Sequence, residues 1–291
     1  MKLSDFYEYA VRFGRERDPR GSNNVRKYED TAILYGNPDT EVRNILAGID
    51  IDTSELLLAD RLAEEHKVDL VLSHHPAGSA WASFYQVIPL QSALWQKAGI
   101  EAGAVNGFLD ERMREVSRKL LAQNHMRTVD AARLLNIPLM CAHTPADNQV
   151  ASFLQEKFDK EAPATVGDLL NSLSLIPEYG IASVNYSGPR SIIGGPGRSC
   201  GRVFVDMTGG TEGPKQLFEK LPSGGIGTVV SMHMSEEHFS RLKAENINVV
   251  VAGHISSDTL GMNLLLDRIE SFSGEKFNFL ECSGFRRIRR I

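Results

Sequence analysis

Short apolar runs alternate with amphipathic segments along most of this chain. An apolar run at 43–51 precedes an amphipathic segment at 53–67, for which Thr53 is the expected helix N-cap. The second half repeats the pattern, with apolar runs at 201–207, 227–232 and 247–253, each followed by a helical pattern. This alternation predicts an α/β fold with mostly parallel sheets.

The composition changes around residues 160–200, where a glycine-rich stretch interrupts the alternation. We therefore predict an N-terminal lobe at 1–160 and a C-terminal lobe at 161–291. Residues 77–136 read as a mostly helical insertion in the first lobe. The alternative is that the two lobes form a single interlinked unit.

Charge and hydropathy exclude several classes of protein. The 291 residues carry a formal net charge of -5, whereas a general nucleic-acid coat needs excess positive charge. No apolar stretch approaches the ~18 residues that span a bilayer, and the N-terminus is too charged for a secretory signal. The three scattered cysteines give no disulfide framework. We expect a cytoplasmic protein with neither a membrane nor a nucleic-acid partner.

Three of the apolar runs end in histidine. "VDLVLSHH" ends at His74 and His75, "IPLMCAH" at His143, and "INVVVAGH" at His254. Because ligand sites in open α/β sheets form beyond the carboxyl ends of the strands, the three runs can deliver imidazoles to one edge. The alternative is that each histidine is a hydrogen-bonded residue at a strand end.

Two aspartates extend this pattern. Asp147 follows His143 by four residues, and Asp258 follows His254 by four. Each His and Asp can converge on one point, although both aspartates also lie where acids cap helix N-termini. Four imidazoles and two carboxylates are too many for one tetrahedral zinc and suit two divalent metal ions. Adjacent histidines can then diverge so that each serves a different ion.

Three motifs together resemble one known family. "SHHP" (73–76), "AHTPAD" (142–147) and "AGHISSDTLG" (252–261) are similar to the Nif-three-like dinuclear metal proteins, also called type 2 homologues of GTP cyclohydrolase I. The resemblance implies two interlinked α/β lobes with a two-metal site between them and a ring-shaped homohexamer. It also implies a set of matching positions: metal ligands at His74, His75, His143, Asp147 and His254, and a further family histidine at His233.

The chain departs from the family in two places. Asp258 stands where the family has Glu, a side chain longer by roughly 1.5 Å, so Asp258 has a shorter reach for a bridging role than the family's residue. The segment 77–136 is longer than is usual and is rich in aromatic residues, among them Trp81 and Trp95. These aromatics either roof the site or make subunit contacts, or they pack the added helices.

Weaker signals complete the sequence reading. The glycine-rich turn at 206–218 is a phosphate-binding loop or a plain turn. Asp50 and Asp52 follow a strand and are candidates to orient a ligating histidine. Cys141 reads as a core residue. The basic tail at 284–291 is a solvated end, or it meets an acidic neighbour or an anionic substrate.

Three functions are compatible with these residues. The first is a metal-dependent hydrolase of a phosphate ester or nucleotide-like substrate, with His233 or Glu237 transferring protons and two ions of Zn, Mn, Fe or Co. The second is a non-catalytic metal-binding protein with a regulatory or assembly role. The third, GTP cyclohydrolase chemistry, rests on the family label alone. The expected partners are further copies of the chain and a small anionic substrate or phosphate.

Overall fold

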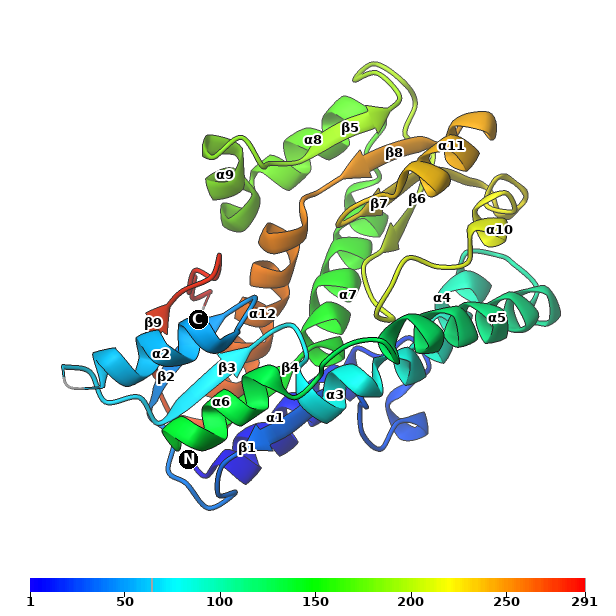
Figure 1. The fold of residues 1–291 in the computed structure, drawn as a ribbon. Helices are drawn as coiled ribbons and strands as arrows, with labels where there is room; N and C mark the ends of the chain where they lie inside the picture. The colour runs from blue at the N-terminus through cyan, green and yellow to red at the C-terminus, as the bar shows by residue number, and fades with distance from the viewer. Residues whose placement is uncertain (64, 291) are drawn as a thin grey trace. The chain divides into compact units, whose positions relative to one another are not determined.

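A computed structural model describes residues 1–63 and 65–290 of the chain. Residue 64, within the helix predicted at 53–67, and residue 291, within the predicted C-terminal lobe, lie outside the described residues. The chain divides into two compact α/β units, and each is built from separate segments (Figure 1). The first comprises 1–87, 115–149 and 261–291, and the second comprises 88–114 and 150–260. The predicted α/β class with mostly parallel sheets is confirmed.

The sheet of the first unit has the strand order β1-β4-β3-β2-β9. Strands β4, β3, β2 and β9 run parallel to their neighbours, and β1 pairs antiparallel with β4 at one edge. The strands are β1 (Thr31–Tyr35), β2 (Asn44–Gly48), β3 (Leu70–Ser73), β4 (Leu139–Ala142) and β9 (Asn278–Glu281).

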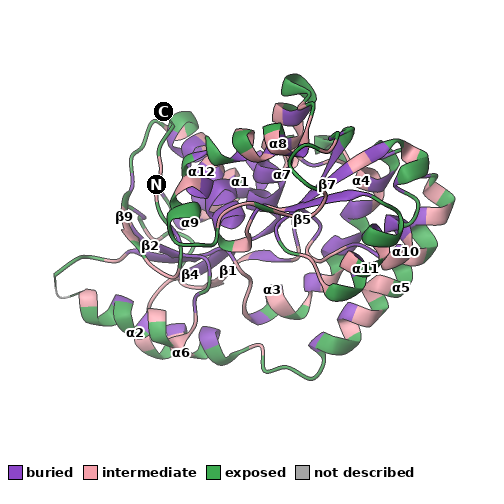
Figure 2. Ribbon diagram, turned by 90° about the horizontal axis from the view of Figure 1, so that it is seen from above, coloured by how far each residue is buried: buried purple, intermediate pink, exposed green. Residues whose placement is uncertain are grey.

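Both faces of this sheet are buried, because successive side chains on a strand point to opposite faces. On β3, Leu70 and Leu72 join the core cluster that includes α1 and α12, whereas Val71 joins the cluster that includes α2 and α6. Figure 2 shows the strands mostly buried and helices α2 and α6 with exposed outer faces. This two-sided burial explains why the sequence has continuous apolar runs here rather than alternating ones.

The helical elements of the first unit are short or moderate in length. They are α1 (Leu3–Glu16), η1 (Ser22–Asn24), α2 (Thr53–Leu62), α3 (Gly78–Ala82) and α6 (Arg127–Leu135). The N-cap of α2 is Asp52 and not the predicted Thr53, because Asp52 and Glu55 form a reciprocal capping box. The helix ends at Leu62, before the predicted end at residue 67.

The sheet of the second unit has the strand order β5-β8-β7-β6. Strands β6, β7 and β8 are parallel, and β5 is antiparallel to β8. The elements are β5 (Arg190–Ile193), β6 (Arg202–Asp206), β7 (Ile226–Ser231), β8 (Asn248–Val251), α4 (Gln91–Lys97), α8 (Val166–Ser174), α9 (Pro177–Val184), α10 (Lys215–Phe218), η3 (Pro222–Gly224) and α11 (Glu236–Ala244).

Four further elements contribute residues to both units: η2 (Phe84–Leu90), α5 (Ala102–Leu120), α7 (Thr144–Glu161) and α12 (His254–Ser273). Within the second unit, Gln155 of α7 bonds the backbone of edge strand β6 at Val203 and Val205, at 3.1 and 3.0 Å. This contact satisfies edge groups that would otherwise be open to another strand. Among the described residues, no helix is both long enough and apolar enough to cross a membrane.

The basic tail is anchored to helix α12. The Arg287 guanidinium contacts Asp267 at 2.6 Å and Glu270 at 2.9 Å, and all three side chains are buried. Arg289 also bonds Glu270, at 3.0 Å. The predicted contact of this segment with acidic neighbours is therefore confirmed.

Candidate metal centre

Three histidines leave the carboxyl edge of the first unit's sheet. Strands β3 and β4 are parallel neighbours with Ser73 opposite Cys141, so the residues that follow each strand emerge side by side. The ring centroids of His74 and His143 are 4.8 Å apart, and those of His74 and His75 are 5.1 Å apart. One potential ligand nitrogen from each ring lies within 4.8 Å of the other two.

The carboxylate of Asp147 joins this cluster from the first turn of α7. Its Oδ1 lies 3.4 Å from Nε2 of His74, and its Oδ2 lies 3.5 Å from Nδ1 of His143. Two ligands bound about 2.1 Å from one tetrahedral ion are separated by about 3.4 Å. The spacing of His74 and Asp147 therefore fits two ligands of the same ion.

A second carboxylate lies behind each of two imidazoles. Nδ1 of His143 lies 2.8 Å from Oδ2 of the buried Asp30, and Nδ1 of His75 lies 2.6 Å from Oδ1 of Asp50. Because carboxylate oxygens accept hydrogen bonds, Nδ1 of each ring donates and Nε2 keeps the lone pair that a metal needs. Such carboxylate–histidine pairs orient metal ligands.

Sequence reasoning identified Asp50 but missed Asp30. Asp30 precedes β1 and reaches His143 only through the antiparallel pairing of β1 with β4. It also accepts a hydrogen bond from the Thr144 hydroxyl at 2.6 Å. The sequence marks Asp30 only as a single acidic residue before a short apolar run, which is a weak indication of a role beside a metal ligand. Asp52, the other predicted orienting residue, instead caps α2 and pairs with Arg127.

The second unit carries its own histidine–aspartate pair. His254 is the first residue of α12, one turn before Asp258. Nε2 of His254 lies 3.4 Å from Oδ2 of Asp258, the same separation that His74 and Asp147 show. Asp258 is buried, whereas the side chain of His254 is 42% exposed and accessible to a ligand.

His233, after β7, lies beside His254, with ring centroids 5.0 Å apart. Nδ1 of His233 is 3.8 Å from a carboxylate oxygen of Glu212, an ion-pair distance rather than a hydrogen bond. The same carboxylate accepts a 2.6 Å hydrogen bond from the Ser235 backbone and lies 3.3 Å from Nδ1 of His238. The Glu212 carboxylate, in the loop between β6 and α10, thus has one backbone hydrogen bond and two imidazoles around it.

The charges in this cluster support one another. Burial alone would raise the pKa of Glu212, but the two histidines and the Ser235 amide hold it well below its usual range. The Glu212 carboxylate raises the pKa of His233. Burial works to lower the pKa of His238, yet Glu212 and the Gly213 carbonyl raise it overall. Burial raises the pKa of Asp206 to about 7.

Two other predicted residues lie elsewhere. Glu237 is on the exposed face of α11, where its carboxylate contacts the Lys215 ammonium. The carboxylate beside His233 is thus Glu212. It lies within the glycine-rich segment 206–218, which was interpreted only as a turn or a phosphate-binding loop. Cys141 is fully buried, and burial raises the pKa of its thiol to about 12, so it stays a protonated core residue as expected.

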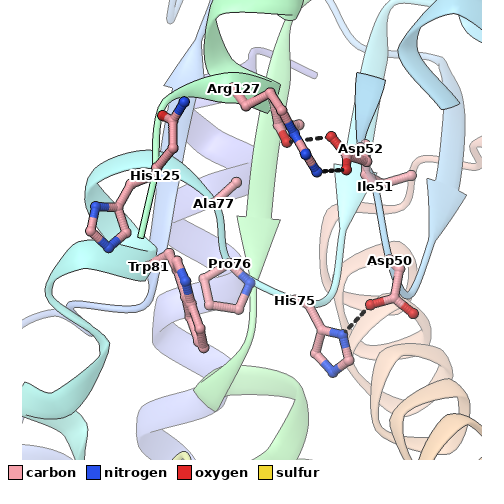
Figure 3. A pocket seen from close by; sticks show the side chains of 11 residues that line it. Asp50, Ile51, Asp52, His75, Pro76, Ala77, Trp81, His125 and Arg127 are labelled. Atoms are coloured by element: carbon pink, nitrogen blue, oxygen red, sulfur yellow. Dashed lines mark hydrogen bonds and ion pairs between the residues drawn. The ribbon is translucent and has the colours of Figure 1, made fainter. Parts of the chain in front are cut away.

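A pocket of about 230 Å³ opens beside His75 in the first unit (Figure 3). Trp81 and Pro76 form one wall and the 50–52 segment the other, with Arg127 at one end. The ring centroids of Trp81 and Phe84 are 4.8 Å apart. Those of Phe84 and His143 are 5.2 Å apart, in an edge-to-face arrangement. One aromatic residue of the insertion thus packs against a predicted ligand, and another lines a cavity next to one.

Comparison with solved structures identifies the architecture. A NIF3 superfamily protein from Sphaerobacter thermophilus aligns with a TM-score of 0.80 and 25% identity, covering 98% of this chain and 98% of that one. The chain has the NIF3 superfamily fold. The resemblance drawn from the histidine motifs is therefore confirmed, as is the fold that it implied.

More distant structures share the NIF3 fold alone. Reduced HcgD from Methanocaldococcus jannaschii aligns with a TM-score of 0.55 at 15% identity, covering 97% of each chain. A Thermus thermophilus protein, TTHA1606, aligns at 0.52 and 16% identity, over 97% of this chain and 98% of that one. No protein-family model and no curated protein matches the sequence. On this NIF3 fold, six side chains form groups that could hold a metal ion: His74, His75, His143, Asp147, His254 and Asp258.

Proposed function

We propose that this protein is a dinuclear metal-dependent hydrolase of phosphate esters or nucleotide-like molecules. The observation that carries the proposal is the 3.4 Å spacing of His74 with Asp147 and of His254 with Asp258. In each unit, an imidazole at a strand end and a carboxylate in the next helix are set as two ligands of one ion would be. The two pairs, together with His75 and His143, make up the proposed ligand set.

The donor set favours an anionic substrate. Two divalent ions bring four positive charges, and the carboxylates of Asp147 and Asp258 remove two, so the loaded centre keeps a net positive charge. Bound ions of Zn, Mn, Fe or Co would polarise phosphate oxygens and lower the pKa of a water molecule. His75 and His143, held by Asp50 and Asp30, would keep the ligand nitrogens oriented.

His233 is the residue that we assign to proton transfer. Its side chain is 52% exposed and lies beside His254, so substrate can reach it. The Glu212 carboxylate raises the pKa of His233, which favours the protonated imidazole that a proton donor needs. Glu237, the other predicted candidate, is engaged with Lys215 on an exposed helix face.

The test combines metal analysis with a screen of phosphoesters. Protein loaded with each metal in turn is assayed against p-nitrophenyl phosphate, nucleoside monophosphates and GTP. We expect metal-dependent phosphate release that chelation and Asp147→Ala abolish and that inorganic phosphate inhibits. His66→Ala removes an exposed imidazole outside the ligand set and is the matched control, with unchanged activity expected.

The alternative outcomes are distinct. Metal binding with no turnover of any phosphoester, in folded protein, would favour the non-catalytic binding role. Ring opening of GTP without phosphate release would favour cyclohydrolase chemistry. Failure to hold metal under any condition would contradict the central proposal.

We further propose that the chain assembles into a homo-oligomer, and the family resemblance points to a hexamer. Exposed apolar side chains on the second unit support self-association, since Leu175, Val184 and Tyr186 are 81, 80 and 90% exposed in the single chain. Multi-angle light scattering at micromolar concentration tests this, and a monomer would contradict it. Val184→Glu should shift the assembly toward smaller species.

A further inference from the structure

The pocket beside His75 is built entirely from the first unit, and the proposed hydrolysis assigns it no role. Its volume of about 230 Å³ lies just below the usual range for ligand sites and suits a single ring system rather than an extended chain. His75, a predicted metal ligand, forms part of its wall (Figure 3). A molecule in the pocket therefore lies next to the proposed metal centre.

Trp81 supplies a flat and fixed surface. Its Nε1 donates to Gln123 Oε1 at 2.8 Å, and its ring packs on Phe84 at 4.8 Å. The side chain is only partly buried, so part of the indole remains open to the pocket. Stacking on such a ring suits any aromatic base and contributes about 1–3 kcal/mol per base.

The polar groups of the pocket select against a phosphate and in favour of amino groups. The charge of Arg127 is balanced by Asp52, which also accepts from Thr128 at 3.2 Å. Asp50 then leaves a negative charge at the wall, with its Oδ1 bonded to His75. Carboxylates repel phosphate and accept hydrogen bonds from the amino groups of bases.

We propose that this pocket binds the amino-substituted heteroaromatic base of a nucleotide, stacked on Trp81, with the phosphate directed past His75 to the metal ion proposed at His74 and Asp147. Only the placement of the phosphate at the metal rests on the proposed function. Binding of the base depends on Trp81 and the carboxylates and does not require metal. The substrate class is thus a nucleoside monophosphate of the size of AMP or CMP.

Intrinsic fluorescence tests the base half directly. The chain has two tryptophans, and Trp95 is fully buried among Phe204 and Phe218 in the second unit. We expect AMP and CMP to quench the accessible Trp81 saturably. UMP, which lacks an amino group, and ribose 5-phosphate should bind at least ~10-fold more weakly, given the energy of stacking and base contacts. Trp95→Phe is the control and should keep the quenching.

Calorimetry on variants completes the test. Trp81→Ala should weaken AMP binding at least ~10-fold, whereas Trp81→Phe, which keeps a ring, should stay within ~3-fold. Circular dichroism checks that both remain folded. Equal affinity for AMP in Trp81→Ala, or equal affinity of wild type for AMP and ribose 5-phosphate, would overturn the proposal. If adenosine quenches Trp81 in chelated protein, the base-binding pocket is supported even where the hydrolase proposal fails. If phosphate binds but no base is preferred, the hydrolase proposal is supported and the base-binding pocket is contradicted.

Discussion

Oδ2 of Asp30 lies 2.8 Å from Nδ1 of His143, and both side chains are buried. The bond fixes the tautomer of His143 from the residue just before β1, the antiparallel edge strand, where no sequence motif marks it. Its consequence for metal binding is measurable.

We expect Asp30→Asn to lower metal affinity about 10- to 100-fold, because partners that orient a ligating histidine have effects of that size. Asn keeps the shape, and its amide oxygen at the Oδ2 position can accept from both His143 and Thr144, so the fold should persist while the negative charge beside the imidazole is lost. Competition with a chromophoric chelator measures the affinity. The exposed carboxylate of Asp39 offers the control Asp39→Asn. Equal affinities in the two variants would mean that the Asp30 contact is structural only.

We expect close to two metal ions per chain in reconstituted wild type and at least ~10-fold weaker binding of one of them in His254→Ala. The reason is that His254 and Asp258 form a ligand pair separate from His74 and Asp147. Plasma mass spectrometry on desalted protein gives the count. Trace occupancy of wild type with Zn, Mn, Fe and Co alike would refute the dinuclear centre.

The Glu212 cluster predicts a pH-dependent stability. The lowered pKa of Glu212 contributes stability that is present above its unfolded value of about 4.5 and is lost as pH falls through the folded value. The raised pKa of His238 contributes stability that is present below about 6.5 and is lost as pH rises through its folded value. The interaction between Glu212 and His238 therefore stabilises the fold most between about pH 4.5 and 6.5.

Urea unfolding of chelated protein at pH 5.5 and pH 8.5 measures this effect. We expect Glu212→Gln to destabilise the protein by about 1–3 kcal/mol at pH 5.5 and by less at pH 8.5. Glu237→Gln, on an exposed helix face, should change stability by no more than ~0.5 kcal/mol at either pH. A Glu212→Gln effect that grows toward pH 8.5 has the wrong sign for this mechanism.

Two adjacent arginines of the tail should differ in how much each contributes to the free energy of unfolding. Arg287→Ala should cost about 3–5 kcal/mol, because it removes the guanidinium that pairs with the buried Asp267 carboxylate and one of the two arginines that pair with Glu270. Arg286, which is 63% exposed and pairs with Glu281, should tolerate Ala within ~0.5 kcal/mol. Thermal and urea unfolding of the two variants decide the comparison. Similar losses in both would show that the tail is held by its backbone.

The sequence predicted the features that local pattern determines. Continuous apolar runs marked the buried strands, and a histidine directly after a run marked His74 and His143 because parallel neighbours end at one edge. It missed Asp30 and Glu212, since each reaches its histidine through chain pairing or a loop and not through spacing. For the lobes it offered either a division at residue 160 or a single interlinked unit, and the compact units draw on interleaved segments that no single linker separates.

The contact between His74 and Asp147 has a consequence for folding itself. The two residues are about 70 positions apart in the chain, so an ion held by both would act as a cross-link that closes a long loop. Cross-links of this length restrict the unfolded chain by an amount on the order of 4 kcal/mol. Metal supply would then govern how long the folded protein persists, even where no substrate is present.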